Sequence, residues 1–299
     1  MQQRVRDRGV WDRTPTTGWA RVAPNLIWSS IMSFSATDAA FEGFRVTRQN
    51  PAAVLLWSMV WLIGLILSSL LAAPAIMPHM AELQAANGDI NALSPEALQA
   101  FGLAMAGFMP PLLLAQALVA PAVYRAVLEP EKRRFGFLRL GKTEARMLGV
   151  LIILVVVQLV LNVGADLATR GAGAAIGLAG GVIVNLIAFA LGLWVAARLS
   201  LVAPLTVLRS GLPLVEGWKR SGPIVWPLIG VNVLAVAMAL LVGLLLALVA
   251  WPMTAAMSGS GAGAGLAALL LMTLMALGFA LITVLLWSPF AAILKQLEG

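Results

Sequence analysis

The sequence predicts an all-α membrane protein with six transmembrane helices. Hydrophobic residues make up 61% of the 299 residues and charged residues only 11%, whereas charged residues form about a quarter of an average soluble protein. The apolar residues fall in continuous runs without polar alternation, which favours membrane helices over the strands of a membrane barrel. Water therefore cannot be the main solvent for this chain.

Six apolar runs are long enough to cross a hydrocarbon layer of about 30 Å, which needs about 20 helical residues. In chain order, we expect transmembrane helices at residues 52–73, 97–124, 147–165, 174–197, 224–250 and 264–293. They form a transmembrane domain over residues 37–299, preceded by a cytoplasmic arm over residues 1–36. The arm has arginines but no apolar core of the signal-peptide type, so we expect it to be retained.

Basic residues predict the orientation, because Lys and Arg resist translocation and stay on the cytoplasmic side. Nineteen of the 20 basic residues agree with one topology: seven before residue 51, seven between the second and third spans, four after the fourth span, and Lys295. Arg170 is the one exception. We therefore expect a multi-pass protein of the bacterial inner membrane with both termini in the cytoplasm.

Short motifs before and after the spans indicate three tandem units. An acid, a small residue and a base recur at residues 42–45, 144–146 and 216–219, each just before an odd-numbered span. The even-numbered spans end in a proline followed by a base, and the tetrapeptide LVAP occurs twice. These motifs predict three helix hairpins in one orientation, each led by an interfacial amphipathic helix. The alternative is that such motifs recur simply because membrane interfaces favour them.

Small residues form a stripe near the fourth predicted span. Gly173, Gly177 and Gly181 recur at every fourth residue, a spacing that lets two helix backbones approach closely. We expect this stripe to contact another helix of the same chain, with association between two chains as the alternative.

Five amide side chains within the predicted spans are candidates for a polar intramembrane cavity: Gln116, Gln158, Asn162, Asn185 and Asn232. The competing interpretation is that each amide joins two helices through a hydrogen bond, worth about 1 kcal/mol in lipid. A transporter would instead require the five amides to converge on one cavity. Pro110 and Pro111 are expected to bend or break the second span, a feature often found at transporter binding sites.

No enzyme or metal-site pattern is present. The chain has no cysteine and a single histidine, His79, so a thiol site, a histidine metal site or a catalytic dyad would lack a second member. No charged residue lies in the middle of a predicted span, which argues against a proton-coupled pump. We therefore expect a protein that is not an enzyme and has no cofactor.

Bases alternate with apolar residues in the loop EPEKRRFGFLRL at residues 129–140. Such a segment can lie on anionic lipid, with each base contributing about 1 kcal/mol. The candidate contacts with anionic headgroups are Arg125, Lys132, Arg133, Arg134, Arg139, Arg209, Lys219 and Arg220. The net charge of +7 thus comes from bases placed for contact with the membrane. We expect the binding partners to be membrane lipids or a membrane protein, and not nucleic acid.

The segment EGWKR at residues 216–220, with residues 223–230, resembles the glycerophosphoryl diester phosphodiesterase membrane-domain-like family. Residues 124–141 resemble uncharacterised alphaproteobacterial inner-membrane proteins. These resemblances imply a polytopic fold and an inner-membrane location. They imply no activity, since the matching segments contain no phosphodiesterase catalytic domain and no catalytic residue can be carried over.

The sequence thus favours a non-enzymatic inner-membrane protein that organises lipid or binds a lipid or protein partner. The alternative is a small-molecule transporter or channel-like protein with a polar intramembrane cavity.

Overall fold

The computed structural model describes residues 35–257 and 262–298, and within these ranges the regular structure is entirely helical. Six helices are long and apolar enough to cross a membrane. The predicted fold class, an all-α protein with six transmembrane helices, is therefore confirmed. Most of the predicted N-terminal arm lies outside the described residues.

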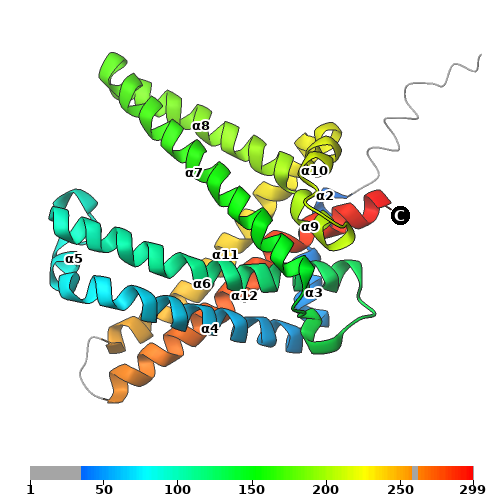
Figure 1. Cartoon of the computed structure of the whole chain (residues 1–299), viewed down its shortest axis with the longest axis horizontal. Coiled ribbons are helices and arrows are strands. Elements are labelled where there is room, and N and C mark those ends of the chain that lie inside the picture. The colour runs from blue at the N-terminus through cyan, green and yellow to red at the C-terminus, as the bar shows by residue number, and fades with distance from the viewer. Residues whose placement is uncertain (1–34, 258–261, 299) are drawn as a thin grey trace, which may run out of the picture. The chain divides into compact units, whose positions relative to one another are not determined.

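The six long helices form three hairpins (Figure 1). The pairs are α4 (Pro51–Ile76) with α6 (Pro95–Leu128), α7 (Lys142–Ile176) with α8 (Leu178–Leu199), and α11 (Val225–Met257) with α12 (Ala262–Glu298). They extend beyond the predicted spans at most ends, because helices continue past the hydrocarbon layer into polar surroundings. The three hairpins support the predicted arrangement in tandem units.

Shorter helices connect the hairpins. Two of them, α2 (Ala36–Ala40) and α3 (Glu42–Gln49), precede the first hairpin, whose loop contains η1 (Met77–His79), α5 (Met80–Ala86) and η2 (Ile90–Ala92). The connection to the second hairpin contains η3 (Arg134–Phe137). The connection to the third contains α9 (Val202–Leu208), α10 (Leu214–Ser221) and η4 (Gly222–Ile224).

The second hairpin differs from the prediction, because the chain reverses at Gly177 without a loop. Gly177 has a φ of +70°, a backbone conformation that glycine adopts without steric cost. Gly173 therefore belongs to α7 and Gly181 to α8, and a side chain added at Gly173 would meet no atom within 4 Å. The predicted glycine stripe along one helix is wrong.

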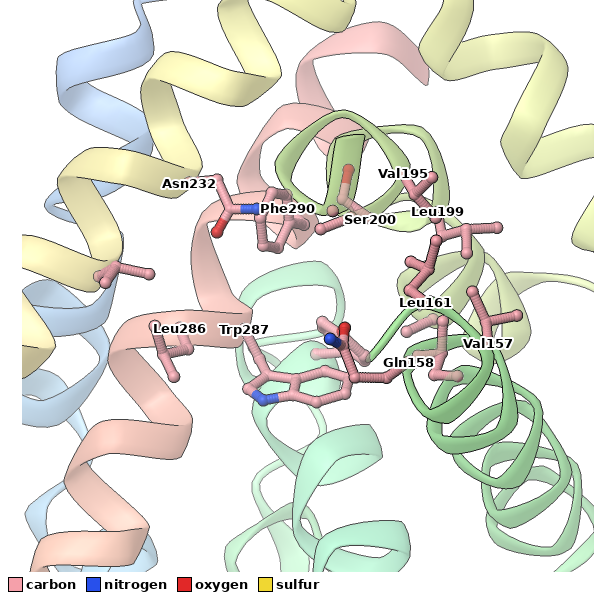
Figure 2. A pocket seen from close by; sticks show the side chains of 16 residues that line it. Val157, Gln158, Leu161, Val195, Leu199, Ser200, Asn232, Leu286, Trp287 and Phe290 are labelled. Carbon is pink, nitrogen blue, oxygen red and sulfur yellow. The ribbon is translucent and has the colours of Figure 1, made fainter. Parts of the chain in front are cut away.

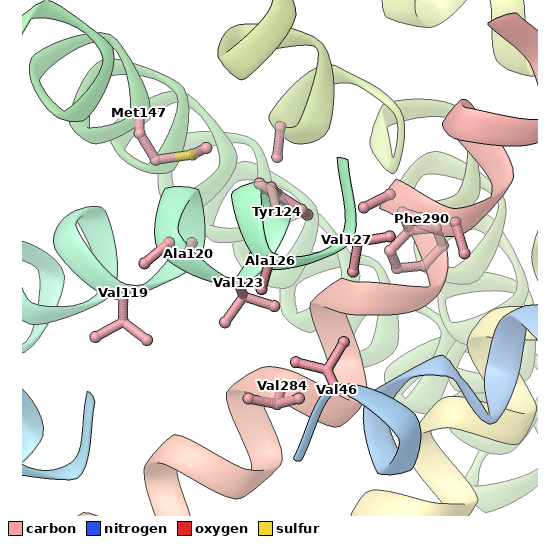
Figure 3. Close-up of a cluster of buried hydrophobic side chains, with 14 of the residues drawn as sticks. Val46, Val119, Ala120, Val123, Tyr124, Ala126, Val127, Met147, Val284 and Phe290 are labelled. Carbon is pink, nitrogen blue, oxygen red and sulfur yellow. The ribbon is translucent and has the colours of Figure 1, made fainter. Parts of the chain in front are cut away.

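The three prolines that end the even-numbered spans lie in one buried core. All residues of the surrounding segments 119–127, 201–206 and 288–294 are buried. Their apolar side chains belong to a single cluster, and Figure 3 shows Val127 of α6 beside Phe290 of α12, near Val46 of α3. The protein's dense packing is thus concentrated where the three hairpins end, at the same end as α3, η3 and α10.

The segment that leads each hairpin packs on the preceding hairpin, and the first packs on the last. A Cβ atom added at Gly43 of α3 would come within 2.9 Å of the Leu285 Cα atom of α12. At Gly217 of α10, an added Cβ atom would come within 3.0 Å of the Val202 Cα atom of α9. Helices meet this closely only where a side chain is missing. Helix α7 also packs on α6. Through these three contacts, each hairpin is packed against both of the others.

A buried ion pair joins the first hairpin to the second. The Arg125 guanidinium of α6 lies 2.6 Å from the Glu144 carboxylate of α7, and the side chains are 5% and 7% exposed. Arg125 also donates a hydrogen bond of 3.2 Å to the Phe137 carbonyl, and the Trp57 indole donates one of 2.8 Å to the Gly136 carbonyl. Both bonds hold the connecting loop, whose residues 135–137 all have positive φ.

Gly217→Ala tests the closure between α10 and α9. The added methyl group would overlap Val202, and overpacking of this kind costs about 1–3 kcal/mol in the free energy of unfolding. Gly230→Ala is the matched control, because Gly230 is an exposed helical glycine with no atom near its Cβ position. We expect the melting temperature in detergent to fall for Gly217→Ala only, and equal values would contradict the close contact.

Glu144→Gln tests the buried pair by leaving the Arg125 charge without a counter-charge. Breaking such a pair costs about 3–5 kcal/mol. The control is Asp166→Asn, because Asp166 pairs with Arg170 at 2.7 Å on the surface, where an ion pair is worth about 0–1 kcal/mol. In thermal unfolding in one detergent, we expect a clearly lower melting temperature for Glu144→Gln than for Asp166→Asn. Equal melting temperatures would argue against a structural role for the buried pair.

Candidate functional site

A cavity of about 320 Å³ lies between the second hairpin and the third, beside the buried core (Figure 2). We call it the inter-hairpin cavity. Its walls come from α6, α7, α8, α11, α12 and the start of α9, and most of its lining side chains are apolar. Gln158 and Ala196, which belong to its wall, are exposed, so the cavity opens at the surface of α7 and α8.

The cavity exists because α8 is packed loosely. In the most apolar 18-residue stretch of α8, only 6% of the residues are buried, compared with 33% in the corresponding stretches of α4, α6 and α12. The α8 wall contains Gly192 and Ala196, and a side chain added at Gly192 would meet no atom within 4 Å. These residues are too small to fill the space towards α11 and α12.

Two amides face the inter-hairpin cavity from opposite walls. Figure 2 shows the side chains of Gln158 on α7 and Asn232 on α11 directed towards it. The Gln158 Nε2 atom donates a hydrogen bond of 3.0 Å to Asn162 Oδ1. The side chain of Asn232 has no hydrogen-bond partner among the described residues, so its donor and acceptor are free for a ligand.

The other polar groups of the cavity lie at its end nearest the core. Tyr124 packs against Trp287 with ring centroids 5.8 Å apart. The Ser200 hydroxyl donates a hydrogen bond of 2.8 Å to the Ala197 carbonyl and keeps its acceptor capacity. No charged residue lines the cavity, which therefore suits a largely apolar ligand with neutral hydrogen-bonding groups.

The remaining candidate amides do not line this cavity. Gln116 accepts a hydrogen bond of 3.4 Å from Thr283 and so joins α6 to α12. Asn162 is exposed beside Gln158, and exposed Asn185 donates to the Gly181 carbonyl of its own helix. The structure thus brings together two of the five amides, Gln158 and Asn232, and the predicted convergence of all five does not occur.

The second span is not broken at its two prolines. Helix α6 continues through Pro110 and Pro111. Neighbouring helices can supply the hydrogen bonds that prolines remove from a membrane helix. The two prolines leave the Ala106 and Gly107 carbonyls without their helical donors. The next carbonyl, that of Phe108, accepts a hydrogen bond of 2.7 Å from the Ser68 hydroxyl, which joins α4 to α6 at this position.

A second candidate region is the basic surface around the ends of the hairpins. Five of the predicted headgroup contacts are exposed there: Lys132, Arg133, Arg134, Arg139 and Lys219. Two large apolar side chains stand among them, since Phe135 is 84% exposed and Leu140 is 88% exposed. This combination of exposed bases and exposed apolar side chains is typical of segments that lie in a membrane interface.

Lys132 pairs with the nearby Glu129 at 3.2 Å, and the other three predicted headgroup contacts have acidic partners from more distant parts of the chain. Arg209 and Arg220 form an exposed network with Glu216 and Glu298, with distances of 2.7–3.4 Å. Arg125 is buried in its pair with Glu144, and it cannot touch a headgroup. The prediction for Arg125 is therefore wrong, because the sequence does not reveal that a carboxylate from another helix folds onto it.

The loop within the first hairpin contains His79. Its Nδ1 atom lies 3.9 Å from a carboxylate oxygen of Glu82. Glu82 also accepts hydrogen bonds of 2.5 Å from the Ser94 amide and 3.1 Å from the Ser94 hydroxyl, which fix the loop to the start of α6. Within residues 35–257 and 262–298, no three His, Asp or Glu side chains are grouped as a metal site.

Some cavity residues were not predicted from the sequence. Tyr124, Ser200 and Trp287 reach the cavity only because three helix ends meet in the core. Of the α8 residues that line the cavity, Gly192 and Ala196 are small, but the sequence alone did not single them out. Comparison with protein-family models, with curated proteins and with solved structures finds no match to this chain.

Proposed function

We propose that this chain is a non-enzymatic protein of the bacterial inner membrane that binds and organises lipid, with its basic surface in the cytoplasm. The main support is the inter-hairpin cavity, which is apolar, uncharged and open at the surface of two membrane-spanning helices. In a bilayer this opening would face hydrocarbon. The molecules available at that position are the acyl chains of lipids.

The cavity has the dimensions and polarity expected for part of a glycerolipid. Its α7 wall runs from Leu154 to Leu161, which corresponds to about 10 Å of helix. Apolar side chains along this length can contact an acyl chain. The free amide of Asn232 and the Gln158 carbonyl offer hydrogen bonds to ester or hydroxyl groups, which are neutral.

The basic surface supports the same function. Its exposed Lys and Arg side chains would meet anionic headgroups of the cytoplasmic leaflet, each contributing about 1 kcal/mol. Phe135 and Leu140 would enter the interface beside Arg134 and Arg139. The charge asymmetry that supports this orientation is strong, because Arg170 is the only basic residue of the described part that lies near the opposite ends of the hairpins.

Transport is less well supported. A path across the membrane needs polar groups at several depths, whereas only two of the five candidate amides, Gln158 and Asn232, line the cavity. Gln116 and Asn185 form hydrogen bonds elsewhere. A membrane-protein partner on the exposed faces of α7 and α8 is a further alternative, and the resemblance to the phosphodiesterase membrane-domain family stays a prediction about fold and location.

Gly192→Phe tests the cavity as the lipid site. Gly192 lines the cavity and has no atom within 4 Å of its Cβ position, so a ring added there would occupy volume needed by an acyl chain. We expect the purified variant to keep less than half of the lipid that co-purifies with the wild type, as measured by mass spectrometry after extraction in mild detergent.

Gly230→Phe is the control, because it adds the same ring at an exposed helical glycine away from the cavity. It should retain lipid at the wild-type level, and both variants should melt like the wild type. A wild-type protein that purifies without lipid and takes up none from mixed micelles would refute the proposal. Solute uptake in proteoliposomes that is lost in Gln158→Leu would favour transport instead.

A further inference from the structure

Arg198 contacts two tryptophan rings at the end of α8, and these rings also contact each other. Its Cζ atom is 4.4 Å from the ring centroid of Trp218 on α10 and 5.8 Å from that of Trp194, one turn earlier on α8. The two indole rings meet edge to face with centroids 5.5 Å apart. Aromatic faces attract a guanidinium, so these rings fix its position. The indole rings are uncharged, so the positive charge of the Arg198 guanidinium is not balanced by them.

No carboxylate of the described residues lies within ion-pair distance of Arg198. Its Nε atom is buried and has no hydrogen-bond partner, although the residue as a whole is only half-buried. The terminal nitrogens are not buried, and they donate no hydrogen bond within the described part of the chain. A partly desolvated charge without a partner is costly, which indicates that an anion belongs at this position.

The geometry around Arg198 limits how it can move. Its Nη1 atom lies against Gly222, so a Cβ atom there would require the guanidinium to shift. The Ser221 hydroxyl donates a hydrogen bond of 2.7 Å to the Arg198 backbone carbonyl. The Arg198 backbone is thus tied to α10, while its guanidinium rests on Trp218 and against Gly222. A preorganised arginine fork loses little side-chain entropy when it binds a phosphate through two of its nitrogens.

The surroundings place Arg198 at the level of lipid headgroups. Tryptophan is enriched at the boundary between hydrocarbon and headgroups. Trp194 is 38% exposed and Trp226, at the start of α11, is 77% exposed. Lys219, the neighbour of Trp218 in the chain, is exposed and adds positive charge to α10. Phosphate is the anion present at this level of a membrane.

We propose that Arg198, which stacks on Trp218 and lies beside Trp194, binds the phosphate group of a membrane phospholipid. This site is separate from the cavity, since the α8 residues that line the cavity are Gly192, Val195, Ala196 and Leu199. It rests on the proposed function in lipid binding. It adds to that function a specific headgroup contact by Arg198, which is not among the headgroup contacts predicted from the sequence.

The test measures lipid binding to the full chain in detergent micelles by native mass spectrometry. The probes are phosphatidylglycerol, diacylglycerol, which lacks the phosphate, and inorganic phosphate. Arg198→Gln should bind phosphatidylglycerol at least about tenfold more weakly than the wild type, since it loses the charge-assisted hydrogen bonds to the phosphate. Its affinity for diacylglycerol should not change. Phosphatidylglycerol should also raise the melting temperature of the wild type more than that of Arg198→Gln.

Arg209→Gln is the matched control, because it removes the same charge from an arginine that already has acidic partners. It should retain most of the wild-type affinity for phosphatidylglycerol. Arg198→Lys, which keeps the charge but loses the planar fork, should lie between the wild type and Arg198→Gln.

Equal affinities of wild type and Arg198→Gln would overturn this site while leaving the proposed function intact, provided that both bind lipid. Loss of all lipid binding from the wild type would instead refute the proposed function. If inorganic phosphate binds as tightly as phosphatidylglycerol, then the site does not recognise phospholipid. A melting temperature of Arg198→Gln near that of the wild type shows that weaker binding does not reflect unfolding.

Discussion

Close packing of three proline-containing segments is the constraint on which the other features of this protein depend. Inside a membrane, helices gain little by burying apolar side chains against each other, because lipid is equally apolar. Stable contacts therefore need small residues, fitted shapes or buried polar pairs. Here they are concentrated in residues 119–127, 201–206 and 288–294, with Gly43 and Gly217 allowing the leading helices to approach and Arg125 neutralised by Glu144.

The position of both candidate sites follows from this concentration of packing. Away from the core, α8 has few buried residues, and its Gly192 and Ala196 cannot fill the space towards the third hairpin. The inter-hairpin cavity begins where the packed segments stop. At the same ends of the helices, the connecting loops bring bases and tryptophans to one level, and these include Arg198 with its two indole neighbours.

Hydropathy predicted the six membrane helices because lipid restricts the choice of structure so strongly. The same property hid the turn at Gly177, since the chain on both sides of it is apolar and no polar loop marks the reversal. The acid, small residue and base motifs predicted three hairpins, and the long helices do pair in this way, but the second motif lies within α7 and not in a separate leading helix. The motifs could not show that the first leading helix packs on the last hairpin, because that contact joins Gly43 to Leu285 across most of the chain.

The candidate sites were predicted less well than the fold. An amide in a membrane helix can be recognised from sequence, but the rotation of its helix decides whether it faces a cavity, a neighbour or lipid. Gln158 and Asn232 share the cavity while Gln116 joins two helices. Basic residues raised a similar problem, because only the fold distinguishes Arg125, which has a buried partner, from Arg198, which has none.

If the basic surface lies on the membrane as proposed, the loop between the first two hairpins would link the membrane interface mechanically to the interior. Its backbone at residues 135–137 is held in left-handed conformations by hydrogen bonds from Trp57 of α4 and Arg125 of α6. Phe135 stands outward on this rigid support. A change in lipid composition that pulls the Phe135 ring deeper or releases it would therefore load those two hydrogen bonds, so the first hairpin would sense the state of the leaflet.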